Sequence, residues 1–541
     1  METRSAKRRR LSLLQDGTGD HDASSGQPTR HRRQISDLPD DVLRHIFTFL
    51  PIKSIAKTSL VSKHWAALWR SLPDLDFTTI ESSDRGISAL EKLIMSNRPN
   101  LEFPQGFLKF LYIVDPEQDF IRQVLRHRSR SPQPRDGLRL LRFCAYLSFT
   151  RLNNLMRDAF RHMVKTLDIE VATNDYFNLP KRVATSEHLQ AFRFVSRFPG
   201  FRLPPLSTMK NGFRSLRKLH LSGVILYNQP FLLDLFTESS FPALRKLSLS
   251  RCLGLEKISI KCGALESVVV KNCSKMNFLE VRGPKLERLR VSGCFPRGRH
   301  MCVLNIHAPR LDVLDWEGSD VPDHCCVHNS NPAIRVSLGF LSIKVEDIDE
   351  KPARSLLRFL SRISHARSLR MDSLSIKILG NMDGLEVLRP FENLAHLELS
   401  TFTGRAYIPP LVSLFMNAPF VECLHIKLVP DHNMRKNVQL DGNLAHLWDE
   451  SVSEEEKQWE IRSKAIGSFL DHLNVVKITG LLDCEEEVSL TKFLLRHGKS
   501  LNKMILCLEA GKVKDSILKK KIRSRIVEFS KAASNAEISF C

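Results

Sequence analysis

The chain has 541 residues, of which 42% are hydrophobic and 26% are charged, as in a soluble globular protein with more than one domain. No run approaches the roughly 18 apolar residues that cross a bilayer, and the apolar stretch after the basic run at 7–10 is too short for a secretory signal. We therefore expect an intracellular protein without a membrane partner.

The net charge of +21 fits nucleic-acid binding, but the basic residues are scattered along the chain and are not interleaved with aromatic residues. No helix-turn-helix, zinc-finger or RNA-binding motif is present, so nucleic acid is not the expected partner. The basic run at 7–10 resembles a nuclear import signal, and the expected location is the nucleus, the cytoplasm or both.

Residues 1–34 are polar and poor in aromatics, which predicts a disordered basic tail. The next segment, 35–77, carries more large apolar residues than a small helical unit can bury. Six of the nine residues from Val42 to Leu50 are apolar, and they spread around the helix instead of forming one stripe. One side can pack internally, and the remaining apolar surface predicts a binding partner.

This segment has the start and stop signals of three short helices. Pro39 suits a helix start, and the two aspartates that follow it favour the positive end of the helix dipole. Pro51 ends that helix, and a second helix is predicted over 53–61. Ser62 can cap a third helix, which carries Trp65 and Trp69 at helical spacing.

The segment LPDDVLRHIFTFLPIKSIAKTSLVSKHWAALW closely resembles the F-box of plant F-box proteins. The resemblance implies that the segment docks on a Skp-type adaptor of a cullin-based SCF ubiquitin ligase. The family's contact positions fall on Leu38, Pro39, Val42, Leu43, Ile46, Leu50, Pro51, Val61 and Trp65.

After a connecting region at 78–154, Leu-x-x-Leu-x-Leu segments recur throughout 155–430. Segments begin 21 residues apart at Leu244, Leu265 and Leu286, and a second series begins at Leu255 and Met276, also 21 apart. Each coil of about 21 residues therefore contributes two short strands, one on each side. Because a single coil cannot bury its apolar face, the coils must stack as a leucine-rich-repeat solenoid.

The twelve cysteines are not expected to form a disulfide framework in an intracellular chain of this length. Cys252, Cys273 and Cys294 recur every 21 residues, which makes them repeat positions. Likeness to leucine-rich repeats implies that they turn inward and bond the turns between coils. Four residues with possible metal-ligand atoms lie close together in the sequence: His324, Cys325, Cys326 and His328. They lack a Cys-x-x-Cys pair, so we expect no metal site there.

Strand alternation sends positions four and six of each repeat segment into the core and positions three, five and seven outward. The outward positions are mainly basic and turn acidic at Asp315 and Glu317. A charged face is solvated by default, although curved solenoid faces are also where such proteins bind. The candidate contacts to an acidic surface of a client protein are Lys218, Lys246, Lys271, Arg288 and Arg290.

The C-terminal part, 461–541, is similar to the FBD module of plant F-box proteins, with strand, acidic turn, helix and strand in order. Residues 431–460 before it are predicted to form an acidic loop in which Glu454–Glu456 are solvated. The chain is thus identified as a member of the F-box–FBD–LRR group, an α/β protein. Its predicted parts are a three-helix F-box, a solenoid of about 21-residue coils and an FBD-like α/β module.

The sequence has no phosphate-binding glycine loop, no G-x-S-x-G turn and no H-E-x-x-H helix, so we expect neither an enzyme nor a cofactor. The resemblance implies a substrate-recognition subunit of an SCF ligase, with the adaptor–cullin complex and an unknown client as partners. The alternative is a nuclear protein that binds nucleic acid or acidic partners through its basic surface, outside any ligase.

Overall fold

The structure is a computed structural model of the 541 residues. It describes residues 35, 38–60, 62–78, 115–129, 137–146, 149–172, 177–178, 180–196, 201–202, 212–224, 235–273, 275–296, 301–340, 350–380, 388–401, 407–428, 453–481, 485–508, 516–533 and 535–541. The predicted tail at 1–34 lies outside this part. The chain divides into two compact units, Met1–Leu50 and Pro51–Cys541.

The first unit contains helix α2 (Asp40–Thr48). Pro39 precedes the helix, and Asp40 and Asp41 lie in its first turn, where carboxylates interact favourably with the helix dipole. The helix ends before Pro51, as the sequence predicts.

The second unit begins with α3 (Ile52–Thr58) and α4 (Lys63–Arg70), which contact each other. The Ser62 hydroxyl accepts a hydrogen bond of 3.2 Å from the Trp65 backbone N–H, which confirms the predicted cap. Helix α3 ends three residues before the predicted Val61, which is itself outside the described residues.

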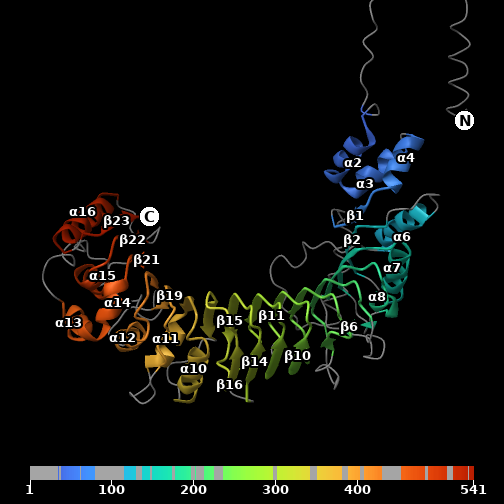
Figure 1. Ribbon diagram of the computed structural model, residues 1–541. Helices are drawn as coiled ribbons and strands as arrows, with labels where there is room; N and C mark the ends of the chain where they lie inside the picture. The colour runs from blue at the N-terminus through green and yellow to red at the C-terminus, as the bar shows by residue number, and fades with distance from the viewer. Residues whose placement is uncertain are drawn as a thin grey trace, which may run out of the picture. The chain divides into compact units, whose positions relative to one another are not determined.

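Most of the second unit is organised by one sheet of sixteen parallel strands (Figure 1). In sheet order the strands are β1 (Asp74–Asp76), β2 (Leu140–Tyr146), β3 (Thr166–Ala172), β5 (Ala191–Ser196), β7 (Lys218–Ser222), β9 (Lys246–Ser250), β11 (Ser267–Lys271), β13 (Arg288–Ser292), β15 (Val313–Ser319), β17 (Arg335–Phe340), β18 (Ser368–Met371), β19 (His396–Thr401), β20 (Cys423–Leu428), β21 (Val475–Leu481), β22 (Lys503–Leu508) and β23 (Glu537–Phe540).

A second parallel sheet lies on the opposite side of the central coils (Figure 1). Its strands, in sheet order, are β16 (His324–His328), β14 (Val303–His307), β12 (Phe278–Arg282), β10 (Lys257–Lys261) and β8 (Phe236–Thr237). A short pair, β4 (Phe177–Asn178) and β6 (Phe201–Arg202), stands apart from both sheets. The central coils therefore contribute one strand to each large sheet, which confirms the predicted two-strand coil.

Elsewhere helices take the place of the second strand. They are α6 (Asp115–Ser129), α7 (Phe149–Arg161), α8 (Lys181–Ala184), α10 (Glu350–Arg362), α11 (Ser373–Gly380), α12 (Ile408–Met416), α13 (Glu454–Arg462), the 3-10 helix η8 (Ser463–Ile466), α14 (Gly467–His472), α15 (Glu485–His497) and α16 (Ser516–Ala533). Several of these connections, such as those between β17 and β18 and between β20 and β21, are longer than any between the central strands.

The long sheet extends past both predicted ends of the solenoid, 155 and 430. Strand β2 comes from the segment predicted as a connecting region, and β21, β22 and β23 come from the FBD-like segment. The FBD-like segment does have the predicted α/β composition, but its strands pair directly with β20 as further coils of the same sheet.

The predicted solvated run Glu454–Glu456 is corrected by the structure. These residues form the first turn of α13, which Ser453 caps by accepting a 3.2 Å hydrogen bond from the Glu456 N–H. Glu455 and Glu456 are buried, and Glu456 pairs with Arg496 of α15. A buried charge is tolerated here because a partner on the neighbouring helix neutralises it.

The repeat cysteines have the inward position that the repeat pattern implies. Cys252, Cys273 and Cys294 are fully buried, and the Cys294 thiol donates to the Val270 carbonyl of the preceding coil at 3.4 Å. The thiol of Cys252 likewise reaches Leu221, at the longer distance of 3.9 Å. Hydrogen bonding to Cys252, together with burial, raises the pKa of Cys273 to about 12. These thiols are structural.

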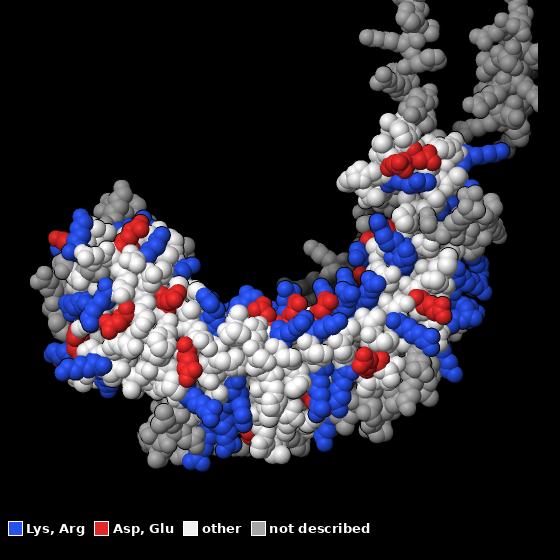
Figure 2. Space-filling view, in the orientation of Figure 1, with Lys and Arg blue, Asp and Glu red and all other residues white. Residues whose placement is uncertain are grey.

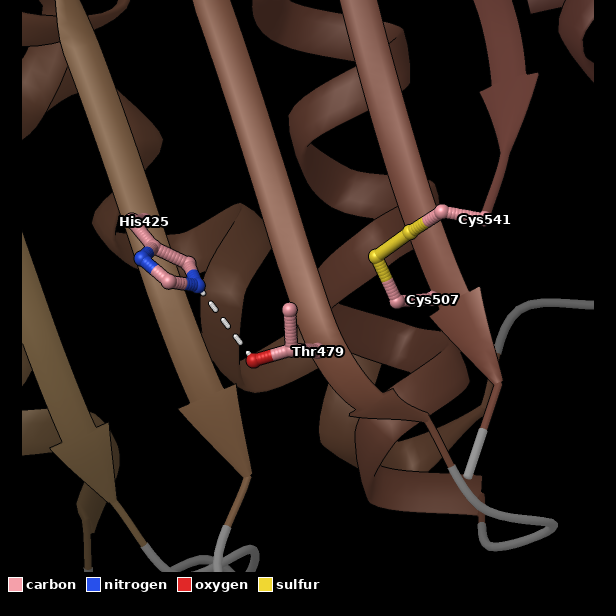
Figure 3. Close-up of a disulfide and its surroundings, with 4 residues drawn as sticks. All are labelled: His425, Thr479, Cys507 and Cys541. Carbon is pink, nitrogen blue, oxygen red and sulfur yellow. Dashed lines mark hydrogen bonds between the residues drawn. A yellow bond between two sulfur atoms is a disulfide. The ribbon is translucent and has the colours of Figure 1, made fainter. Parts of the chain in front are cut away.

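One disulfide is present among the described residues, between Cys507 of β22 and the terminal Cys541 (Figure 3). Strand β23 pairs in parallel with β22 and ends at Phe540, so the bond joins β22 to the residue directly after β23. The remaining cysteines that the structure describes are free thiols, as expected of a chain without a disulfide framework.

Candidate functional site

Helix α2 in the first unit has two apolar stripes with different exposure. Leu43 and Phe47, four residues apart, are buried. Val42 is 43% exposed, Phe49 is 74% exposed, and Ile46 between them is half-buried. The predicted surplus of apolar surface is therefore present as a second stripe on the same helix.

The predicted adaptor contacts in the first unit divide along these stripes. Leu38, Pro39, Val42 and Leu50 are exposed and can meet a partner, whereas Leu43 is buried. Leu43 therefore offers no surface to a partner in this structure. Phe49, which caps the end of α2, was not among the predicted contacts, although its place seven residues after Val42 could have identified it.

In the second unit, the predicted contact Pro51 is exposed and Trp65 is half-buried. Val61 lies outside the described residues, but its neighbour Leu60 is 86% exposed. An aliphatic side chain this exposed indicates apolar surface around the start of α4 that the unit does not bury.

The outward face of the long sheet carries the predicted client contacts. Lys218 of β7 and Lys246 of β9 are register partners, and Arg288 of β13 lies two strands further in the same row. All three side chains are exposed, and Lys271 of β11 is half-buried. Alternation is as predicted, because the intervening residues of these strands are buried.

The register of the strands also brings several charged side chains of the outward face into ion pairs with each other. Position five of successive strands forms one row, in which Asp168 of β3 accepts from Arg142 at 2.9 Å and from Arg193 at 2.7 Å. In the same row Arg290 lies beside Asp315 and donates to it at 2.8 Å. Arg290 is therefore paired within the sheet, and its role as a client contact stays a prediction.

Towards the C-terminus the same row continues with Arg370, Glu398 and His425. Glu398 lies 3.5 Å from Arg370 and 3.8 Å from His425. Burial lowers the pKa of His425, and its second ring nitrogen lies 3.3 Å from the Thr479 hydroxyl (Figure 3). Figure 2 shows this mixture of red and blue side chains along part of the sheet.

The four residues for which we expect no metal site lie on the edge strand β16. Alternation puts Cys325 on the opposite side from Cys326 and His328, so the four candidate ligands cannot converge. The Cys326 thiol lies 3.9 Å from a ring nitrogen of His328. Within the described residues, no three His, Cys, Asp or Glu side chains are grouped as metal ligands, and no helix is long and apolar enough to cross a membrane.

Position eight of the repeat, directly before the cysteine position, has a conformation that the repeat pattern did not predict. Gly223, Arg251, Asn272, Gly293 and Gly318 have positive φ angles between 50° and 70°. The first four directly follow their strands, whereas Gly318 lies within β15. Glycine and asparagine at this spacing are a readable signal, because both adopt left-handed backbone more easily than other residues.

Comparisons with known proteins agree with this architecture. A family model described as F-box domain matches residues 35–76, and a model described as At1g61320/AtMIF1, LRR domain, matches residues 137–537. The second match reaches past both predicted ends of the solenoid, as the long sheet does.

Three relatives from Arabidopsis thaliana are similar over most of their length. The chain is 38% identical to the putative F-box/FBD/LRR-repeat protein At4g03220, over 94% of this chain and 95% of the relative. It is 23% identical to F-box/LRR-repeat protein 13, over 90% and 92% of the two chains. It is 22% identical to F-box/FBD/LRR-repeat protein At3g26920, over 89% and 90%.

Proposed function

Because this chain belongs to the plant F-box/FBD/LRR-repeat family, we propose that it is the substrate-recognition subunit of an SCF-type cullin ubiquitin ligase. In this role the F-box binds a Skp-type adaptor and the repeat sheet binds a client protein. The nucleus, the cytoplasm or both are its proposed location.

The observation that carries the proposal is the exposed apolar stripe of α2 within the matched F-box segment. Val42 and Phe49 are exposed although they are apolar, and Leu38 and Leu50 flank the helix with further exposed apolar surface. Removing such side chains from water on binding contributes about 25 cal/mol per Å² of apolar surface. A Skp-type adaptor is the partner that the F-box resemblance assigns to this surface.

The proposed contribution of the chain to ubiquitin transfer is positioning. The ligase's cullin-bound subunits supply the chemistry, and the receptor holds the client's acceptor lysine near the activated ubiquitin. Holding two reactants together raises their effective concentration and reduces the entropic cost of reaction. No catalytic group of this chain takes part in the proposed mechanism.

A pull-down of purified adaptor with the full chain tests the proposal. Wild type is expected to retain the adaptor, and the double variant Leu38→Ala/Val42→Ala is expected to lose most of it. Ile461→Ala is the control, since Ile461 is also apolar and exposed, at 73%, and lies far along the sequence. Equal recovery by wild type and the double variant would contradict the proposal. In a second pull-down that contains both adaptor and cullin, recovery of the adaptor without cullin would place the protein outside a ligase.

A further inference from the structure

The outward face of β7, β9 and β11 differs from the rest of the long sheet in its charge balance. The outward positions of these strands, with the residues directly before and after each, carry six cationic side chains and one carboxylate, Glu266. We call the six cations the basic patch: Arg217, Lys218, Arg245, Lys246, Arg251 and Lys271.

Most of the basic patch is not neutralised within the described part of the chain. Arg245 lies 3.4 Å from Glu266, and Arg251 donates to the Ser222 hydroxyl at 3.2 Å. The structure records no ion pair or hydrogen bond from the side-chain nitrogens of Arg217, Lys218, Lys246 or Lys271 to described residues. This contrasts with the adjoining strands, where Arg193 and Arg290 are paired with aspartates.

The cations lie at both ends of the strands, with small polar residues between them. Arg217, Lys218, Arg245 and Lys246 lie at the start of β7 and β9, and Lys271 lies at the end of β11. The floor between them contains Ser248, Ser250 and His220, which hydrogen-bonds to Ser248 at 2.9 Å. Lys246 and Lys271 occupy positions three and seven of neighbouring strands, a separation of about 13 Å along the strand direction.

We propose that the basic patch is the client-binding site and that its occupant is an extended acidic segment of the client, with carboxylates four residues apart. The inference rests on the proposed function, in which a client is bound. An extended segment advances about 3.3 Å per residue, so carboxylates at positions i and i+4 can reach the cations at both ends. The serine hydroxyls of the floor can donate to backbone carbonyls of the segment.

The surroundings favour a short acidic protein segment over a nucleic acid. A polyphosphate chain that extended past the patch would meet Asp168 and Glu170 on one side and Glu287, Asp315 and Glu317 on the other. The outward positions of the strands from β3 to β15, as far as the structure describes them, also present no Phe, Tyr or Trp on which bases of a single strand could stack. Charge complementarity is therefore confined to an area of a few strands.

Selection from a random heptapeptide library on the full chain tests the inference. Wild type is expected to enrich peptides with Asp or Glu four positions apart. The charge-reversed variant Lys246→Glu/Lys271→Glu is expected to enrich Lys or Arg in their place, an outcome that misfolding cannot produce. No acidic enrichment by wild type, or the same enrichment by the variant, would overturn the assignment.

The affinity of a selected acidic peptide, measured by fluorescence anisotropy at physiological ionic strength, gives the second readout. Lys218→Gln/Lys246→Gln is expected to weaken binding about tenfold, since two charge contacts are lost. Lys503→Gln is the matched control, because Lys503 occupies the same row of the sheet on the distant strand β22. Equal losses in both variants would contradict a localised site.

Two further measurements distinguish an acidic protein segment from nucleic acid, and the peptide site from the proposed ligase role. A labelled DNA oligonucleotide that bound more tightly than the peptide and was lost in the same lysine variants would assign the basic patch to nucleic acid and overturn the inference. The adaptor pull-down is repeated with the lysine variants, which are expected to retain the adaptor. If wild type bound acidic peptides but no adaptor, the proposed ligase role would fail while the peptide site remained.

Discussion

Helix α2 and the repeat coils both have regular apolar patterns, but their apolar side chains differ in exposure to solvent. In the coils, inward residues such as Leu247, Val268 and Leu289 are at most 1% exposed, because each coil is covered by its neighbours. In α2, Val42 and Phe49 remain exposed beside the buried Leu43. The comparison teaches that stacking of neighbouring coils buries the repeat pattern completely, whereas the pattern of α2 leaves apolar surface that the proposed adaptor would cover.

The largest expected contrast comes from truncating one residue of each kind. Leu289→Ala is expected to destabilise the protein by about 3 kcal/mol, because it leaves a cavity between coils. Val42→Ala is expected to cost less than about 1 kcal/mol, since the side chain is already half in water. Urea unfolding followed by circular dichroism measures both, with hydrogen exchange of β13 as a local readout. Similar losses would remove the distinction between the two regions.

The turns between coils offer a second test of how closely the coils fit together. At Gly223 the φ angle is +70°, and an added Cβ would overlap the Ser196 carbonyl oxygen. Gly223→Ala is therefore expected to destabilise by about 2 kcal/mol.

The equivalent position of the next coil has Arg251, at a φ angle of +50°. Arg251→Gly is expected to stabilise by about 0.5 kcal/mol, because relief of left-handed strain exceeds the added chain entropy and the lost hydrogen bond to Ser222. Thermal unfolding of the pair of glycine variants measures both effects. A destabilised Arg251→Gly would show that its hydrogen bond outweighs the backbone strain.

The burial of the coils also predicts a pH dependence. Burial raises the pKa of the Cys262 thiol from near 9.0 to about 12. The protonated thiol therefore stabilises the fold fully below pH 9, and this contribution is lost as pH rises towards 12, because only the unfolded chain releases the proton. The expected slope is up to about 1.4 kcal/mol per pH unit.

This slope is measured as the difference in unfolding free energy between wild type and Cys262→Ala from pH 8 to 11. Other titrating groups cancel in the difference. A difference that stayed constant over this range would show that water reaches the thiol in the native coils.

The smallest effects distinguish paired from unpaired charges on the outward face. Arg290→Ala is expected to cost about 0.5 kcal/mol, because it removes the ion pair to Asp315. Lys246→Ala is expected to leave stability within about 0.3 kcal/mol of wild type, since its ammonium forms no ion pair with a described residue. Chemical denaturation of both variants at low and high salt measures the contrast, and an equal loss would contradict it.

Residue patterns predicted the parts of the structure that depend on local spacing. The Leu-x-x-Leu-x-Leu period gave the strands and their inward positions, and the proline and serine signals gave the three short helices. Charge pairing could not be predicted in this way, because Arg290 and Asp315 are 25 residues apart and meet only through the register of two strands. The burial of Leu43 and the bond between Cys507 and Cys541 likewise depend on tertiary packing.

The extension of the sheet beyond 155 and 430 was missed for a related reason. Strands such as β2 and β22 lack a second apolar strand segment in the same coil, so the 21-residue period disappears where helices replace it. Pairing with a neighbouring strand then decides membership of the sheet, and pairing is not visible in the spacing of one chain.

Isothermal titration of the full chain with a purified Skp-type adaptor tests the central claim most directly. Wild type is predicted to bind at a 1:1 ratio, and Val42→Asp is predicted to weaken binding at least about tenfold, because a charge would be buried against apolar adaptor surface. Ile461→Asp, on an exposed apolar residue of α13, should leave the affinity unchanged. Absence of wild-type binding, or an equal loss in both variants, would contradict the account.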